Sequence, residues 1–221
     1  MSIRYTQPPD NAAEIVRAGL EQAVTAGITS EASDVGAPTP ELTRPHDVYD
    51  IGADAVAAGG DVSAARLTSV RGLVGRGDSA VAVEMHEVPA GASGQPGATG
   101  AAGPTVQAEP RESPPPGSHA LSQVNSGPYV GSTERELDRL EASAADSEAD
   151  VEVRVLRCSA LYFMALWLHR PDNPDHDQFR PLEPVPPGLE ADRTYSLREL
   201  MAVLQPQAAR LLSAHEPGMS S

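Results

Sequence analysis

Lysine is missing from this sequence, and every one of its 16 basic residues is an arginine. Acidic residues are more numerous, at 31, so the formal net charge is −15 at pH 7. A chain this acidic repels phosphate backbones and anionic lipid surfaces. We therefore expect a partner that is neither a nucleic acid nor a membrane. The missing lysine itself indicates GC-rich coding, because alanine, glycine, proline and arginine are abundant, and it carries no functional meaning.

Cysteine and long apolar runs are also scarce. The single cysteine, Cys158, excludes an intramolecular disulfide and a metal cage of several cysteines, and it fits a reducing compartment. No apolar run approaches the roughly 18 residues of a membrane-spanning helix, and the N-terminus lacks the basic and apolar regions of a signal peptide. We expect a cytoplasmic protein.

Aromatic residues make up only 4% of the chain, which holds 21 prolines and 19 glycines. This composition indicates one modest domain, with much of the chain outside its core. Residues 151–169 hold the densest run of large apolar side chains, so we expect the core to form around them.

The usual catalytic motifs are absent: the sequence has no Walker A or GxGxxG loop, no GxSxG elbow and no HExxH zinc motif. Cys158 and Ser159 are the candidate nucleophiles beside the expected core, and either needs a histidine base brought close by the fold. A buried, unreactive cysteine is the favoured interpretation. We expect no cofactor.

One group of possible metal ligands lies in a short turn after the apolar run. His169, Asp172, Asp175 and His176 fall within eight residues, and such donors suit a divalent metal such as Zn²⁺. Two prolines mark the same segment as a turn, where Asp and Asn are common for conformational reasons. A plain turn is the favoured alternative.

A second candidate is the loop that contains Asn125, Ser126 and Tyr129. A polar loop before a helix can present backbone amides to an anionic ligand. The alternative is a turn that only begins the helix.

Alternating or continuous apolar residues predict strands, with the second and third forming a hairpin. The predicted strands cover 46–52, 67–74, 80–88, 151–168 and 178–184. Ala82, Glu84 and His86 are predicted to face water. At residues 158–159 the chain either bends within one strand or turns between two.

Capping residues and apolar spacing predict three helices, which begin after Asp10, after Thr133 with Glu136 as a capping box, and after Ser196 with Glu199. The first helix either docks on the domain or forms a frayed arm. The charged face of the second helix is predicted to be solvated.

These elements predict an α+β fold: a small antiparallel sheet of about four to five strands, with two or three helices packed on one face. We expect an N-terminal arm and linker at 1–45, one domain at 46–214 and a loose tail at 215–221. A disordered Gly/Pro/Ala-rich insertion is expected at 89–118. Its glycine at every third residue would also suit a short collagen-like trimer, but a flexible insertion is favoured.

Four blocks resemble a family of bacterial proteins, mostly actinobacterial, whose function is unknown. These blocks are residues 46–74, LSQVNSGPYVGSTERELDRLE at 121–141, VRVLRCSALYFMALWLH at 153–169, and residues 179–204. The resemblance implies that the blocks form one domain, and it implies no activity or site residue.

We therefore expect a non-enzymatic accessory or protein-interaction domain with an unknown protein partner. The alternative is a small hydrolase or metal-dependent enzyme that uses His169 and His176. The oligomeric state stays open.

Overall fold

The computed structural model describes residues 2–27, 41–77, 80–88, 105–107, 118–143 and 150–215. Within these ranges, ten strands form one sheet and four α-helices cover it. The helices are α1 (Ala12–Thr25), α2 (Ala53–Ala57), α3 (Pro128–Ser143) and α4 (Leu197–His215). The strands are β1 (Ser2–Arg4), β2 (Thr43–Asp50), β3 (Arg66–Val74), β4 (Val81–Glu87), β5 (Thr105–Gln107), β6 (His119–Asn125), β7 (Asp150–Cys158), β8 (Phe163–His169), β9 (Gln178–Pro181) and β10 (Tyr195–Ser196).

The strand order is β10-β9-β8-β7-β2-β3-β4-β6-β5, with β1 beside the start of β7. β1 and β2 run parallel to β7, and the other pairs are antiparallel. The prediction of a small antiparallel sheet of four to five strands was therefore wrong. The sheet is larger and mixed because the strands of the N-terminal half join those of the C-terminal half through the β2–β7 pair. Four strands were not predicted: β6, which has seven residues, and β1, β5 and β10, which have only two or three residues each, too few to show an apolar period.

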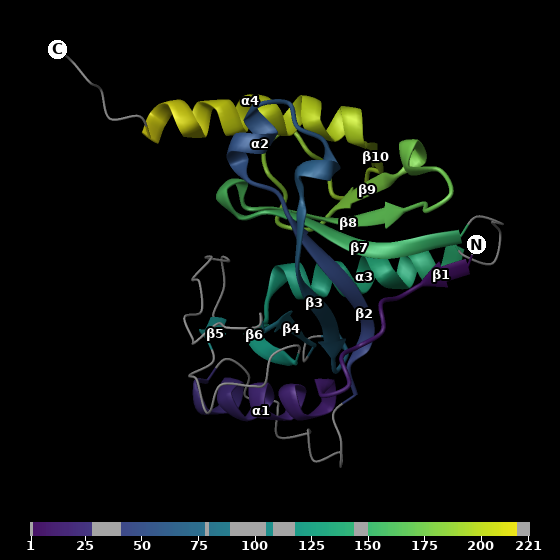
Figure 1. Ribbon diagram of the computed structural model, residues 1–221, viewed down its shortest axis with the longest axis vertical. Coiled ribbons are helices and arrows are strands. Elements are labelled where there is room, and N and C mark those ends of the chain that lie inside the picture. The colour runs from purple at the N-terminus through teal and green to yellow at the C-terminus, as the bar shows by residue number, and fades with distance from the viewer. Residues whose placement is uncertain are drawn as a thin grey trace.

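Helices lie on both faces of the sheet, which contradicts the expectation of helices on one face. One face of β7 and β8 packs on α2 and α4, and the opposite face packs on α3. In the N-terminal half, β3, β4 and β6 pack on α1. Figure 1 shows α3 between the β7–β8 layer above and the β3–β4 layer below, with α4 at the top and α1 at the bottom. The sheet therefore curls around α3.

The run at 151–168 forms two strands, because a 3-10 turn at Ser159–Leu161 joins β7 to β8. Alternation along a strand predicts that the odd-numbered and even-numbered residues of 163–168 face two different layers, and this is confirmed. Phe163, Ala165 and Trp167 lie in the core with α4, while Met164, Leu166 and Leu168 lie in the core with α3. The same alternation predicts Tyr162 on the layer of Met164 and Leu166, which is wrong, because Tyr162 stands in the turn with φ 49° and is 65% exposed.

The β3–β4 hairpin was predicted correctly, but the solvent face assigned to β4 was wrong. Ala82 is fully buried and Glu84 is only 2% exposed. His86 is partly exposed. Residues on this face of β4 are buried because α3 and β7 lie over them, and both are distant in sequence.

Helix starts were predicted with mixed success. The capping box of Ser196 and Glu199 is confirmed, since the Ser196 N–H and hydroxyl donate to Glu199 Oε2 at 2.9 and 2.8 Å. The one at Thr133 was wrong, because α3 begins at Pro128. Thr133 donates to Tyr129 O within the helix at 2.6 Å. The first helix packs on the sheet and starts after Asn11 instead of Asp10.

The insertion predicted at 89–118, with its repeated glycines, lies outside the described residues except for β5 and Ser118. Most of the linker and of the C-terminal tail also lie outside them. The predicted domain boundaries stay predictions. In the part of the chain that the structure describes, no helix has the length and apolar character needed to cross a membrane.

Candidate functional site

The face of the sheet that curls around α3 carries buried charges, centred on Arg157 of β7. Its guanidinium donates to both carboxylate oxygens of Asp50 at 2.7 Å and to Glu84 Oε2 at 3.0 Å. Neighbouring strands lie about 4.8 Å apart, so in a flat sheet β7 and β4 would be about 14 Å from each other. The Arg157–Glu84 ion pair therefore crosses the inner face of the curled sheet and joins its two halves.

Glu84 accepts hydrogen bonds from three residues on three different strands. Ser69 Oγ and Gln123 Nε2 donate at 2.6 and 2.7 Å, in addition to Arg157. Burial by itself raises the pKa of Glu84, but the charge of Arg157 and the hydrogen bonds outweigh it, so the pKa lies below its ordinary value. The carboxylate is thus ionised and fully paired.

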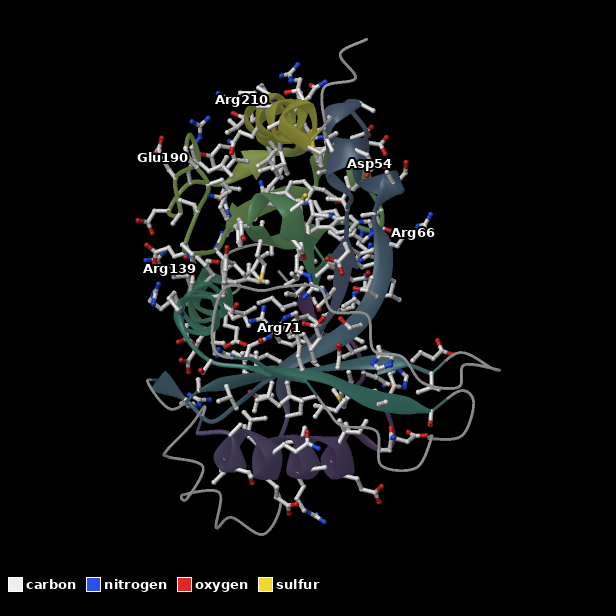
Figure 2. All side chains as sticks on the ribbon, turned by 90° about the vertical axis from the view of Figure 1, so that its left-hand side faces the viewer. Asp54, Arg66, Arg71, Arg139, Glu190 and Arg210 are labelled. Carbon is white, nitrogen blue, oxygen red and sulfur yellow. The ribbon has the colours of Figure 1, made fainter. Side chains whose placement is uncertain are left out.

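Arg71 of β3 lies on the same inner face of the sheet and is only 1% exposed. Its Nη1 donates to Met164 Sδ at 3.1 Å, a weak acceptor, and its Nε has no hydrogen-bond partner among the described residues. Burial lowers the pKa of Arg71 to about 10, while the negative charge of Glu84 raises it. Figure 2 shows Arg71 in the interior, beside α3, whereas Arg66 at the start of the same strand points outward. Within the described ranges, Arg71 is therefore a buried cation that has the charge of Glu84 nearby but no hydrogen bond to a carboxylate.

His46 of β2 is paired with Arg71 in the register of β2 and β3, and it is fully buried. Its Nδ1 lies 2.8 Å from Arg44 O, which can only accept, so Nδ1 carries the proton. Its Nε2 is then an acceptor, and none of the residues that the structure describes donates a hydrogen bond to it. Burial, and next the charge of Arg71, lower the pKa of His46 to about 4. The imidazole is neutral at pH 7.

The charged face of α3 is exposed, as predicted, apart from the partly buried Glu134, and its side chains also contact both halves of the sheet. On one side, Glu134 accepts from Gly77 N, and Arg44 donates to Asp138 and Glu141 at 2.6 Å. On the other side, Arg135 pairs with Glu183 and Arg139 pairs with Asp192. These contacts hold α3 over the buried charges.

Among the predicted metal ligands, His169 is bound to a carboxylate of the same turn. Asp177 accepts from Trp167 Nε1 at 2.6 Å, from Arg170 N at 2.8 Å and from His169 Nδ1 at 2.9 Å. Asp177 is buried, while the His169 side chain is 15% exposed. The proton on Nδ1 leaves Nε2 of His169 as the free basic atom.

The other predicted ligands, Asp172, Asp175 and His176, are exposed in the turn between β8 and β9. Within the described ranges, no group of three or more His, Cys, Asp or Glu side chains could hold a metal ion. The predicted set of ligands therefore has no support from this geometry, and metal binding stays a prediction.

Of the predicted ligand loop, Asn125 ends β6, Ser126 stands in the following turn, and Tyr129 lies in the first turn of α3. The hydroxyl of Tyr129 donates to Tyr162 O at 2.6 Å. The loop is thus tied to the exposed turn between β7 and β8, although a bound anion stays a prediction.

Cys158 is buried, and burial raises the pKa of its thiol, which disfavours the reactive thiolate. On the same face of the sheet, the Arg154 guanidinium lies 4.9 Å from the ring centre of Trp167 and 5.2 Å from that of Tyr49. Arg154 therefore packs against aromatic rings on this face of the sheet.

The sequence did not predict the site residues Arg71, Glu84, His46 and Arg157. The sequence did contain a signal, since Arg71, Glu84 and Arg157 are charged residues inside predicted strands. Such a residue indicates either a solvent-facing position or a buried ion pair.

No protein family, no curated protein and no solved structure was found to match this chain. The resemblance to bacterial proteins of unknown function thus stays a prediction, and the geometry of the site is the basis for assigning a function.

Proposed function

We propose that this protein is a non-enzymatic accessory domain that acts by binding a protein partner, with the β7–β8 turn as its contact surface. The observation that carries the proposal is Tyr162, which is 65% exposed and has φ 49°. The left-handed conformation costs about 1 kcal/mol for a residue other than glycine, and it suits Asn or Gly better. Folding alone thus does not account for a tyrosine at this position.

The turn is also held rigidly, which favours binding. Tyr129 donates to the Tyr162 carbonyl oxygen at 2.6 Å, so α3 fixes the backbone that presents the exposed ring. Tyrosine is enriched at protein interfaces because it offers a large contact area with little loss of side-chain freedom. An exposed tyrosine on a fixed backbone therefore supports a role in recognition.

The test compares Tyr162→Asn with the wild-type protein. Asn tolerates the left-handed conformation, so we expect the free energy of unfolding to stay equal or to rise by about 1 kcal/mol.

A photo-crosslinking amino acid at position 162, incorporated in the native host, is expected to give a discrete adduct with the partner. The same amino acid at Leu67, another exposed apolar position, is the matched control. Identical patterns at both positions would contradict the proposal.

A second candidate function is the small hydrolase, and the contact between Asp177 and His169 favours it. A buried carboxylate that fixes Nδ1–H of an imidazole prepares Nε2 to act as a general base. The test is hydrolysis of simple esters by the wild type and by His169→Gln, with His176→Ala as a second variant and elemental analysis for metal. Absence of any His169-dependent hydrolysis and of stoichiometric metal would contradict this candidate.

A further inference from the structure

Residues 2–5, the N-terminal strap, are held on the molecule by a short row of contacts. β1 pairs with β7 over only three residues, and Tyr5, which follows β1, packs against the core under α3. The hydroxyl of Tyr5 donates to Glu141 Oε1 at 2.7 Å. Burial, and next this hydrogen bond, raise the pKa of Tyr5, so the hydroxyl keeps its proton. The carboxylate of Glu141 on α3 is therefore the polar anchor of the strap.

The same carboxylate holds the start of β2. Arg44 donates to Glu141 Oε2 and to Asp138 Oδ1 at 2.6 Å. The backbone of Arg44 has φ 50°, a left-handed conformation that is unfavourable for a residue other than glycine. His46 Nδ1 donates to Arg44 O at 2.8 Å and fixes this conformation. His46, Arg44, Glu141 and Tyr5 thus form one chain of contacts, and Figure 1 shows the chain passing the first half of β2 on its way from β1 to α1.

This arrangement has no place for a second proton on His46. Its Nε2 is buried, lies next to the strand position of Arg71, and has no hydrogen-bond partner within the described ranges. Burial, and next the charge of Arg71, lower its pKa to about 4. The charged groups on the neighbouring elements are Arg71 on β3, Glu84 on β4, Arg157 on β7, and Glu134, Asp138 and Glu141 on α3.

The carboxylates among these groups bond other donors. Both oxygens of Glu84 accept from Ser69, Gln123 and Arg157, while those of α3 accept from Gly77 N, Arg44 and Tyr5. A buried cation without an anion or an acceptor is strongly unfavourable. An imidazolium at position 46 is therefore stable only if the ring reaches water.

We propose that His46 is an acid-sensitive latch for the N-terminal strap. When the ring takes up a second proton it moves towards water, Arg44 leaves its left-handed conformation, and the strap separates from β7 while the rest of the sheet stays folded. Because β2 pairs with β7 only from Arg154 onward, the separation exposes the edge of β7 at 150–152, where an extended segment could pair. The latch does not involve the Tyr162 turn, so it does not depend on the proposed partner contact.

The test is amide hydrogen exchange of the full-length protein, followed by NMR between pH 7.5 and pH 5, with each rate divided by the intrinsic rate at that pH. We expect the protection of the β1 amides to fall by about 30-fold, as for a histidine whose pKa rises from about 4 in the closed state to 6.5 in the open one. Low concentrations of urea show whether the opening is local. An opening of the strap exposes little surface, so the β1 amides should be insensitive to urea, whereas the amides of β8 should respond strongly.

Two variants separate the latch from the strap. The side-chain amide of His46→Asn can still donate to Arg44 O but does not titrate, so we expect the 30-fold change to disappear. Tyr5→Phe loses the hydrogen bond to Glu141, so we expect about 5- to 10-fold lower protection at both pH values, with the pH dependence kept. A pH-independent protection of β1, an equal urea response of β1 and β8, or a change that persists in His46→Asn would overturn the proposal. The wild-type exchange decides the question even if His46→Asn does not fold.

Discussion

The cores on the two faces of the β7–β8 pair differ in chemistry, although each is covered by a long helix. Under α4, the core consists mainly of apolar and aromatic side chains such as Trp167 and Phe179. Under α3, the same sheet buries Arg71, Glu84 and Arg157 beside its apolar residues. An apolar core depends on volume and is insensitive to pH, whereas a charged core depends on each partner and its protonation. The two cores are therefore expected to respond differently to substitution and to pH.

Removing a charge under α3 is expected to have the largest effect. Glu84→Ala removes the negative charge that acts on Arg71 and one of the two carboxylates bound to Arg157, so we expect the free energy of unfolding to fall by about 4 to 5 kcal/mol. Unfolding in urea measures this loss. Glu87→Ala, at the exposed end of the same strand, is the control and should change stability by about 0.5 kcal/mol or less. Equal effects would show that the buried network contributes nothing specific.

Deleting volume under α4 is expected to cost somewhat less. Leu204 is fully buried between α4 and the sheet, and Leu204→Ala should lower the free energy of unfolding by about 3 to 4 kcal/mol. The loss should be the same at pH 5 and pH 7, because no titratable group is involved. Leu212→Ala, at an exposed position of α4, is the control. A strong pH dependence of the Leu204→Ala effect would remove the contrast between the two cores.

Sequence patterns predicted the features that depend on neighbouring residues and missed those that depend on residues distant in the sequence. The capping box at Ser196 and Glu199 was predictable because its hydrogen bonds join residues three positions apart. The faces of β8 were predictable because side chains alternate along a strand. Glu84 was assigned to the solvent face because it alternates with valines along β4. The same alternation occurs whether that face contacts water or is covered by α3 and β7.

The candidate site was predictable to the same limited extent. His169 was identified from its neighbouring carboxylates, and Asp177, only eight positions further along the chain, does bind it. Arg71 and His46 come together only through the pairing of β2 with β3, and their burial depends on α3, more than 50 residues further on. Single-sequence patterns contain no information on such pairing.

The dependence of stability on acid pH is expected to distinguish the two cores, because His46 is buried on the α3 side. Its pKa is lowered to about 4 in the folded state, from 6.5, so the unfolded chain binds more protons between these values. Stability is therefore complete above about pH 6.5 and falls as the pH drops towards about 4, by up to about 3 kcal/mol. Glu84, whose folded pKa is also lowered, adds a further loss at lower pH. Urea midpoints measured across this range should follow this curve.

His46→Asn tests the assignment of this pH dependence. The variant is expected to be less stable at pH 7 but to lose little further stability between pH 6.5 and pH 4. His176→Asn, at an exposed position, should keep the wild-type curve. If both variants keep it, the titrating group lies elsewhere in the molecule.

The smallest effect is expected at the surface of α3, where Arg135 pairs with Glu183 and both side chains are about half exposed. An exposed ion pair contributes about 0.2 to 1 kcal/mol, because water and salt screen it. A double-mutant cycle with Arg135→Ala and Glu183→Ala should give a coupling energy of that size, which disappears in about 1 M salt. A larger coupling energy that persists in salt would mean that exposed charges on α3 stabilise the fold as strongly as the buried ones do. The α3 and α4 sides would then differ in all their charges, and not in their buried charges alone.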